Sequence, residues 1–357
     1  MNALSASQDL GHGRDEGAGM AAGGGDKGGR VTMAAIGRLA GVSQVTVSRA
    51  LSDPSKVSAD TLRRIREAID QTGFVPNALA GALVSRKSRL ISALVPSITS
   101  IVYSAMVQAF GERMRAKGYQ ILLSETGSAP EDEEDAIMLH LSRRPDAMML
   151  TGIHHSPKAR KVLLGAGIPV VELWDVTESP IDLCVGFSHG AAGRAAADFA
   201  ADAGYRRAAL VHAGDERALR RKDAFAERFR QRTGQDPAEI NLNAPASLGQ
   251  GRLALSRLIE ETGFGGGLIF CSSDLLAHGV VTEAQARGLR IPQEIGVLGF
   301  GDQEFAAHVE PALTTLSVDR EALGRQAAEA LLCRIEGEPI DRPIFDLGFK
   351  LVRRDSA

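Results

Sequence analysis

The sequence has few of the residues that mark several common classes of protein. Its three cysteines, Cys184, Cys271 and Cys333, stand alone, without a CxxC pair or a neighbouring cluster of histidines. This usage argues against a disulfide framework, a zinc site or another bound cofactor, and it indicates a reducing, cytoplasmic location. The single Trp and three Tyr argue against an aromatic-lined polysaccharide groove. No apolar run approaches the roughly 20 residues that cross a bilayer, so no membrane segment is expected.

The first 30 residues differ from the rest in composition. They are rich in Gly, Ala and Ser with scattered charges, and they contain no apolar run typical of a signal peptide. We predict a disordered tail over residues 1–30. The rest of this 357-residue chain is long enough for two or three domains.

Charge is distributed unevenly along the chain. The segment 30–90 has ten Lys and Arg against four Asp and Glu, a balance of +6, whereas the whole chain carries −3 and the remainder therefore −9. A small basic head on an acidic body is typical of a protein that binds nucleic acid through the head.

Residues 31–76 carry the pattern of three short helices. The first is predicted over about Met33–Ala40, with Thr32 as its cap and Leu39 among its inward residues, together with Ile36 and Ala40. Gly41 then breaks the helix, and Ser43 caps a second one through about Leu51. A third helix starts at the cap Ser58 and stops near Gly73. We therefore predict a helix-turn-helix domain over 31–76.

The second helix carries side chains suited to reading DNA in the major groove. Arg49 can grip a guanine through two parallel N–H groups, and Gln44 can bond a purine edge or a phosphate. An exposed Val45 on a polar face suits a thymine methyl group, and nearby hydroxyls suit phosphates. The alternative is an unrelated three-helix bundle with a solvated polar face. The complete set predicted to contact DNA is Thr32, Ser43, Gln44, Val45, Thr46, Ser48, Arg49, Thr61, Asn77 and Leu83.

Residues 77–89 connect this domain to the body. Their first part, 77–84, is too short and too rich in small residues to form a stable helix alone, and basic residues follow it. Paired with its copy in a dimer on DNA, it is predicted to form a hinge helix that wedges Leu83 into the minor groove. A flexible linker is the alternative.

The head resembles that of the lac repressor family of bacterial regulators almost throughout. The matching runs are Val31-Thr32-Met33, Leu39-Ala40-Gly41-Val42-Ser43, Thr46-Val47-Ser48-Arg49-Ala50-Leu51, Val57-Ser58, Thr61 and Gly73-Phe74-Val75-Pro76-Asn77. Within the family, shorter matches in the body are similar to the gluconate-operon repressor branch. They are Ile168-Pro169-Val170-Val171-Glu172-Leu173-Trp174-Asp175, Ile181-Asp182, Val185-Gly186-Phe187 and Asp346-Leu347-Gly348-Phe349. The resemblance implies a sequence-specific repressor with a periplasmic-binding-protein-like body, which acts as a homodimer or a tetramer.

The body, 90–357, alternates short apolar runs with amphipathic helical patterns. This alternation predicts an α/β fold with two lobes, each a doubly wound parallel sheet. The predicted strands are Ile91–Val95, Gln120–Leu123, Ala147–Leu150, Pro169–Leu173, Ala208–Val211, Gly267–Cys271 and Gly296–Gly299. Ligands of such sheets bind beyond the carboxyl ends of the strands.

Polar side chains follow several of these runs, as a polyhydroxylated ligand requires. Arg221 resembles the family's effector-binding base, and its guanidinium suits a carboxylate, which favours a sugar acid over a neutral sugar. A solvated helix face is the alternative, because Arg220 and Lys222 are also basic. The predicted effector-binding residues are Ser97, Thr151, Glu172, Asp175, Arg221, Ser273 and Asp274.

Four further features of the sequence carry predictions. Gly301 stands where many family members have an acid after the Gly-aromatic pair, which weakens a ligand role for Asp302 and leaves the effector open. His154-His155 is interpreted as surface loop rather than a metal site. The acidic run 131–135 is interpreted as a helix start and the glycine run 263–267 as a turn.

We expect the effector to close the lobes, unfold the hinge and release DNA, although the opposite sign also occurs in related regulators. Gluconate, 2-ketogluconate and a neutral sugar are the alternative effectors. A sugar-binding module without DNA function predicts a secretion signal and the absence of a basic head. The sequence meets neither prediction, because it has the basic head and no apolar run typical of a signal peptide. An enzyme is disfavoured because the sequence shows no nucleophile-base set and no metal-ligand spacing.

Overall fold

The computed structural model describes residues 31–76, 87–98, 101–127 and 129–357. The chain divides into two units, Met1–Gly81 and Ala82–Ala357. The predicted tail 1–30, most of the predicted hinge, and the predicted DNA contacts Asn77 and Leu83 lie outside the described residues.

The first unit is built from three α-helices and a 3-10 turn. The helices are α1 (Met33–Ala40), α2 (Gln44–Ser52) and α3 (Ala59–Thr72), with the 3-10 turn Pro54–Lys56 before α3. Hydroxyls of Thr32, Ser43 and Ser58 cap their first turns, as predicted. Between α1 and α2 the chain turns at Gly41, whose φ of 65° lies in the left-handed region that glycine tolerates best.

The core of this unit is formed by apolar residues from all three helices. Its fully buried members include Ile36, Val47 and Ile65. Leu39, which we predicted to face inward, is instead 59% exposed. The buried arc of α1 runs from Ile36 through Ala40 to Gly37, and Leu39 lies about 60° beyond Ile36 on the other side.

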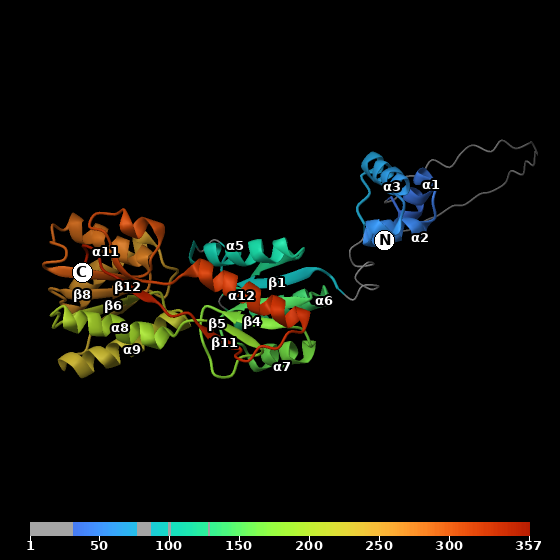
Figure 1. Ribbon diagram of the computed structural model, residues 1–357. Helices are drawn as coiled ribbons and strands as arrows, with labels where there is room; N and C mark the ends of the chain where they lie inside the picture. The colour runs from blue at the N-terminus through green and yellow to red at the C-terminus, as the bar shows by residue number, and fades with distance from the viewer. Residues whose placement is uncertain (1–30, 77–86, 99–100, 128) are drawn as a thin grey trace, which may run out of the picture. The chain divides into compact units, whose positions relative to one another are not determined.

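The second unit contains two six-stranded sheets, one in each lobe (Figure 1). The N-terminal lobe has the strand order β11-β5-β4-β3-β1-β2, and all its strand pairs are parallel. Helices α5 and α12 pack together with one set of buried side chains, and α6 and α7 pack with another. The strands are β1 (Leu90–Val95), β2 (Gln120–Glu125), β3 (Ala147–Thr151), β4 (Val170–Leu173), β5 (Leu183–Gly186) and β11 (Ile344–Asp346). The helices are α5 (Ile101–Ala116), α6 (Pro130–Ser142), α7 (Pro157–Ala166) and α12 (Arg320–Glu336).

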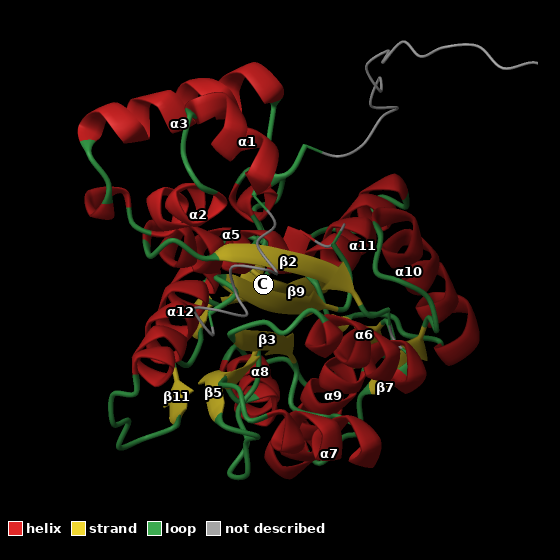
Figure 2. Cartoon of the chain, turned by 90° about the vertical axis from the view of Figure 1, so that its right-hand side faces the viewer, coloured by secondary structure: helices red, strands yellow, loops and turns green. Residues whose placement is uncertain are grey.

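The C-terminal lobe repeats this plan with the order β12-β10-β9-β8-β6-β7, in which only the β10–β12 pair is antiparallel. Helices α8 and α9 pack together, as do α10 and α11, which lie side by side in Figure 2. The strands are β6 (Ala208–His212), β7 (Ala238–Asn241), β8 (Gly267–Cys271), β9 (Ile295–Gly301), β10 (Thr314–Ser317) and β12 (Lys350–Val352). The helices are α8 (His189–Asp202), α9 (Glu216–Thr233), α10 (Leu248–Thr262), α11 (Asp274–Ala286) and the 3-10 turn Glu304–Ala307.

The predicted α/β fold with a helix-turn-helix head and two parallel-sheet lobes is confirmed. Every predicted strand is present, most of them one or two residues longer than predicted. The acidic run 131–135 opens α6, and the glycine run 263–267 joins α10 to β8, as predicted. None of the described helices is long and apolar enough to cross a membrane.

Candidate DNA-binding surface and effector site

One face of α2 presents the side chains that we predicted to read DNA. Gln44, Val45, Ser48 and Arg49 are exposed, whereas Val47 and Ala50 on the opposite face are buried in the core. Val45 is 65% exposed, an unusual position for an isolated apolar side chain on a polar helix face. The helix therefore offers hydrogen-bonding groups and one apolar contact together, which is what a base edge with a thymine methyl requires.

The predicted hydroxyl contacts lie at helix caps. Thr32 accepts a hydrogen bond from the amide of Ala35, and Ser43 accepts one from Thr46 and shares a second between their hydroxyls. Thr61 is half-buried in the first turn of α3, where its hydroxyl accepts a bond from Ser58. These hydroxyls hold the ends of the helices and remain close to the solvent, where a phosphate can approach them.

The charges of this unit are only partly neutralised within it. Asp60 on α3 pairs with Arg63 and Arg64. Within the described part of the chain, the guanidinium groups of Arg38, Arg49 and Arg66 have no acidic partner within 4 Å. The unit therefore retains positive charge available to phosphates.

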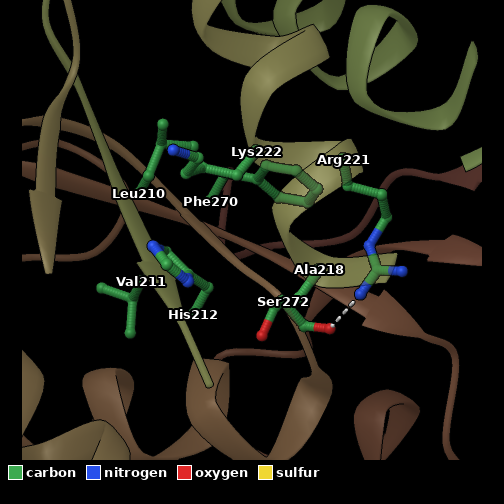
Figure 3. Close-up of a pocket in the computed structure, with 8 residues that line it drawn as sticks. All are labelled: Leu210, Val211, His212, Ala218, Arg221, Lys222, Phe270 and Ser272. Atoms are coloured by element: carbon green, nitrogen blue, oxygen red, sulfur yellow. Dashed lines mark hydrogen bonds between the residues drawn. The ribbon is translucent and has the colours of Figure 1, made fainter. Parts of the chain in front are cut away.

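Arg221 is the centre of the candidate effector site. It extends from α9, is 4% exposed, and its guanidinium carbon lies 3.9 Å from the centre of the Phe300 ring. Its Nη2 donates to the carbonyl of Ser272 over 3.1 Å, the bond marked in Figure 3. Its buried Nε has no partner within the described structure. Burial lowers the pKa of Arg221 to about 10, so it stays charged at neutral pH.

His189 connects Arg221 to the N-terminal lobe. The Nδ1 atom accepts from Nη1 of Arg221 at 2.8 Å, and Nε2 donates to the carbonyl of Trp174 at 3.0 Å. Burial and, next, the positive charges of Arg221 and Arg217 lower the pKa of His189 to about 2. The imidazole is therefore neutral, and its one proton is held on Nε2 by the Trp174 carbonyl.

Two further arginines on the first turns of α9 reach across to the N-terminal lobe. Arg220 forms an ion pair with the buried Asp175, which follows β4. Arg217 donates to the hydroxyl of Tyr103 on α5 at 2.8 Å. Three cations thus converge where the two lobes meet, and this arrangement suits an anionic ligand. Our sequence analysis did not predict Arg217, although it lies one helical turn before Arg221 on the same helix.

Aromatic rings form a wall beside these cations. Trp174 makes edge-to-face contacts with Tyr103 and Phe187, both with ring centres 5.6 Å apart. A small hollow lies next to Arg221 in the C-terminal lobe (Figure 3). It is lined by Leu210, Val211, His212, Ala218, Arg221, Lys222, Phe270 and Ser272. Apolar rings with a few convergent polar groups are typical of a small-molecule site.

The other predicted effector residues lie at the ends of strands, with different surroundings. Ser97 is half-buried beyond β1, and the hydroxyl of Thr151 at the end of β3 donates to the carbonyl of Leu94. Ser273 caps α11. Asp302 pairs with Arg354 over 2.7 Å.

Glu172 and Asp274 are fully buried and already bonded inside their lobes. Glu172 accepts from the amide of Ile181, and the structure does not bring its carboxylate to Arg221. Asp274 accepts from the Thr315 hydroxyl and from the Gln303 amide. Both carboxylates are therefore already bonded within their lobes, and their contact with an effector stays a prediction.

The interpretation of His154-His155 as surface loop is half wrong. The side chain of His154 is 60% exposed, whereas that of His155 is 1% exposed and lies between Glu133 and Glu172. The distances from its ring nitrogens to those carboxylates are 3.0 and 3.3 Å. Two buried or nearly buried carboxylates outweigh the cost of burying a cationic imidazole. No group of three or more metal-binding side chains occurs among the residues placed by the structure.

His155 makes the stability of the body depend on pH. Although burial opposes it, pairing with Glu133 and Glu172 raises its pKa to about 9. Since this value lies above the ordinary 6.5, its stabilisation is complete below about pH 6.5 and is lost as the pH rises through about 9. The difference corresponds to about 3 kcal/mol. We expect the free energy of unfolding in urea to fall between pH 6.5 and 9.5 in the wild type and to change less in His155→Gln. His154→Gln is the matched control, and an equally steep profile in His155→Gln would contradict this assignment.

Asp274 is a buried acid whose pKa is also raised, so that here the neutral form is favoured and not the charged one. Burial raises its pKa to about 6 despite the hydrogen bonds from Thr315 and Gln303. The folded protein therefore binds this proton more tightly than the unfolded chain, and stability is lost as the pH rises from about 4 to about 6. Asp274→Asn removes the charge; its amide oxygen can still accept from the Gln303 amide, and its NH2 group can donate to the Thr315 hydroxyl, which then accepts instead of donating. We expect it to be about 1 to 3 kcal/mol more stable than the wild type at pH 7.5 and to lose that advantage at pH 4. The exposed Asp341→Asn serves as control, and a less stable Asp274→Asn at pH 7.5 would refute the expectation.

Comparisons with known proteins match both units. Residues 32–77 match the family described as bacterial regulatory proteins, lacI family, and residues 197–357 match the periplasmic binding protein-like domain. The HTH-type transcriptional regulator GntR of Pseudomonas aeruginosa is 34% identical over 330 residues, which cover 92% of this chain and 96% of that protein.

Solved structures agree. A lacI-family transcriptional regulator from Silicibacter pomeroyi is 31% identical, with a TM-score of 0.85 over 91% of this chain and 99% of that one. The lac repressor dimer bound to operator and the anti-inducer ONPF is 25% identical, with a TM-score of 0.78 over 92% of this chain and 99% of that one.

Proposed function

Since this chain belongs to the lacI family of bacterial regulatory proteins and is therefore a DNA-binding transcriptional regulator rather than an enzyme, we propose that it represses its targets until a sugar acid binds. Gluconate is the proposed effector, and 2-ketogluconate is its nearest alternative. The observation that carries the sugar acid is Arg221, a buried cation with an unpartnered Nε beside two more arginines.

The carboxylate is proposed to bind the guanidinium of Arg221. A guanidinium has five N–H groups, of which the structure uses one for His189 and one for Ser272. The buried Nε–H with a neighbouring Nη–H presents the fork that a carboxylate accepts in two parallel bonds. A neutral sugar would leave this charge without a counter-ion. Ser97, Thr151, Asp175 and Ser273 are proposed for the hydroxyls, and Glu172 and Asp274 as supports.

DNA is proposed to bind through the outward face of α2, with base contacts from Gln44, Val45 and Arg49. Phosphate contacts are assigned to Thr32, Ser43, Thr46, Ser48 and Thr61. We propose residues 31–76 as the DNA-binding domain, 77–89 as the hinge with Asn77 and Leu83 on DNA, and 90–357 as the effector and dimerisation domain of a cytoplasmic homodimer. Two domains at adjacent half-sites match a pseudo-palindromic operator.

The contacts between the lobes support a ligand-controlled closure. Arg217 with Tyr103, and Arg220 with Asp175, cross from one lobe to the other at the candidate site. A ligand that adds contacts to both lobes favours the closed arrangement, and only such a difference in affinity can shift the equilibrium. We propose that closure moves the lobe next to the hinge and releases DNA.

A mobility-shift titration tests this function. The full-length protein is mixed with DNA from upstream of its own gene and titrated with gluconate, 2-ketogluconate and glucose. A retarded band that a sugar acid abolishes and glucose does not is the expected result. Absence of a retarded band at low salt would overturn the proposed regulator function. Release of the DNA by glucose alone would overturn the proposal that the effector is a sugar acid. A rise in melting temperature with the same ligand is the supporting measurement.

A further inference from the structure

Four exposed cations gather at one edge of the N-terminal lobe. Arg89 directly precedes β1, Lys117 lies three residues before β2, and Arg143 and Arg144 lie just before β3. Strands β3, β1 and β2 are neighbours in the sheet, and their registers align Leu90 with Gln120 and Ile91 with Ala147. Because parallel strands all begin at the same edge, these cations lie together on it. We call the four residues the basic edge.

Contacts within the lobe hold the basic edge in place. The Arg89 guanidinium donates to the Lys117 carbonyl and lies 5.2 Å from the centre of the Tyr119 ring. The Asp146 carboxylate accepts from the amides of Ser88 and Arg89 and from the Ser88 hydroxyl. The carboxylate of Asp146, which directly precedes β3, therefore anchors the chain that enters β1.

The charges of the basic edge are not neutralised by the protein. Within the described ranges, none of its four side chains has an acidic group within 4 Å, although ion pairs are common elsewhere on the body. Glu336 lies close enough for its charge to contribute to the raised pKa of Tyr119, although it forms no ion pair with these cations. Four cations without an acidic partner within 4 Å stand out on a chain whose net charge is −3.

The edge also has a particular place in the chain. The described part of the body starts at residue 87, and Arg89 directly precedes β1, the first strand after the DNA-binding unit (Figure 1). Whatever orientation the two units adopt, the body is tethered to DNA-bound protein at this edge and not at the edge that faces the effector cleft. Unpaired cations held beside a tether to DNA are suited to phosphate groups.

We propose that the basic edge of the effector-binding body binds the DNA backbone directly, in addition to the contacts made by the helix-turn-helix domain. The partner is double-stranded DNA, read through its phosphates and not its bases. This edge therefore adds affinity and salt dependence without sequence selectivity. The inference rests on the regulator function.

The test is the salt dependence of operator binding by the full-length protein. The variant Lys117→Gln/Arg143→Gln/Arg144→Gln removes three exposed cations whose side chains form no hydrogen bond or ion pair with the described residues. Each phosphate contact contributes about 0.9 to the slope of log affinity against log salt. We expect the magnitude of the slope to fall by about 1 to 3 per chain, with the same preference for operator over scrambled DNA.

A matched control removes equal charge from the corresponding edge of the other lobe. Arg206 and Arg207 precede β6, Arg290 lies before β9, and all three are exposed. The variant Arg206→Gln/Arg207→Gln/Arg290→Gln is expected to keep the wild-type slope. An unchanged slope in the basic-edge variant, or an equal fall in the control, would overturn the proposal. Failure of the wild type to bind any operator would instead overturn the regulator function itself, so the two failures are distinguishable.

Discussion

Replacing Gln44, Val45 and Arg49 together by alanine is expected to weaken operator binding about a thousand-fold, to the level of non-specific DNA. A bidentate contact to a base contributes about 1 to 3 kcal/mol, and specific complexes exceed non-specific ones by at least about 10³. All three side chains are exposed on α2 and outside the core, so the variant keeps its fold. Fluorescence anisotropy with operator and scrambled duplexes at fixed salt measures both affinities.

Two further measurements on the triple variant are the slope of log affinity against log salt concentration and the melting temperature. The slope reports phosphate contacts, so it should change little beyond the loss of one cation, and the melting temperature should stay at the wild-type value. Arg66→Ala on α3 is the control, since it removes an exposed, unpaired cation from the same unit. Undiminished selectivity in the triple variant would refute the assignment of α2 as the reading helix.

The second large effect is expected at Arg221. Arg221→Met keeps the length and much of the volume of the side chain but removes the charge and its N–H groups. We expect the affinity for gluconate or 2-ketogluconate to fall about 100-fold or more, because charge-assisted hydrogen bonds contribute about 1.5 to 3 kcal/mol each. Titration calorimetry measures the loss.

The same variant should still bind its operator, and the sugar acid should no longer release it. Arg230→Met is the control on the same helix, since Arg230 is exposed and, among the residues that the structure describes, forms an ion pair only with the exposed Asp236. Full release of the Arg221→Met protein by the wild-type concentration of sugar acid would exclude Arg221 as the carboxylate ligand. Loss of operator binding as well would be a sign of damage to the body, which a circular dichroism melt detects.

The local signals in the sequence were sufficient for the elements themselves. Caps at Thr32, Ser43 and Ser58 and the left-handed glycines Gly41 and Gly73 act within one helical turn, so the limits of α1 and α3 follow from neighbours in the chain. The predicted strands other than β2 are largely buried, and both faces of a buried parallel strand are apolar. The strands that were not predicted individually, β5, β7, β10, β11 and β12, have at most four residues.

Burial of single side chains was harder to predict. Leu39 has the spacing of a core residue, yet the small contact surface of α1 leaves it outside the buried arc. Glu172 was predicted as a ligand because it ends a strand, but the alternation of β4 turns it toward His155 and away from Leu173's side of the sheet.

By itself, the amino-acid sequence determined the type of fold and the outward face of α2 with Gln44, Val45 and Arg49, and it pointed to Arg221 as a candidate ligand. These features depend on periodicity, capping and residue chemistry over short stretches. Only the tertiary structure decided that Arg221 meets His189, Ser272 and Phe300, and that His155 is held between Glu133 and Glu172. The same holds for the joining of Arg89, Lys117, Arg143 and Arg144 at one sheet edge. The physical reason is that electrostatic and packing interactions depend on distance in space, and strand order and register bring together residues that lie tens of positions apart in the chain.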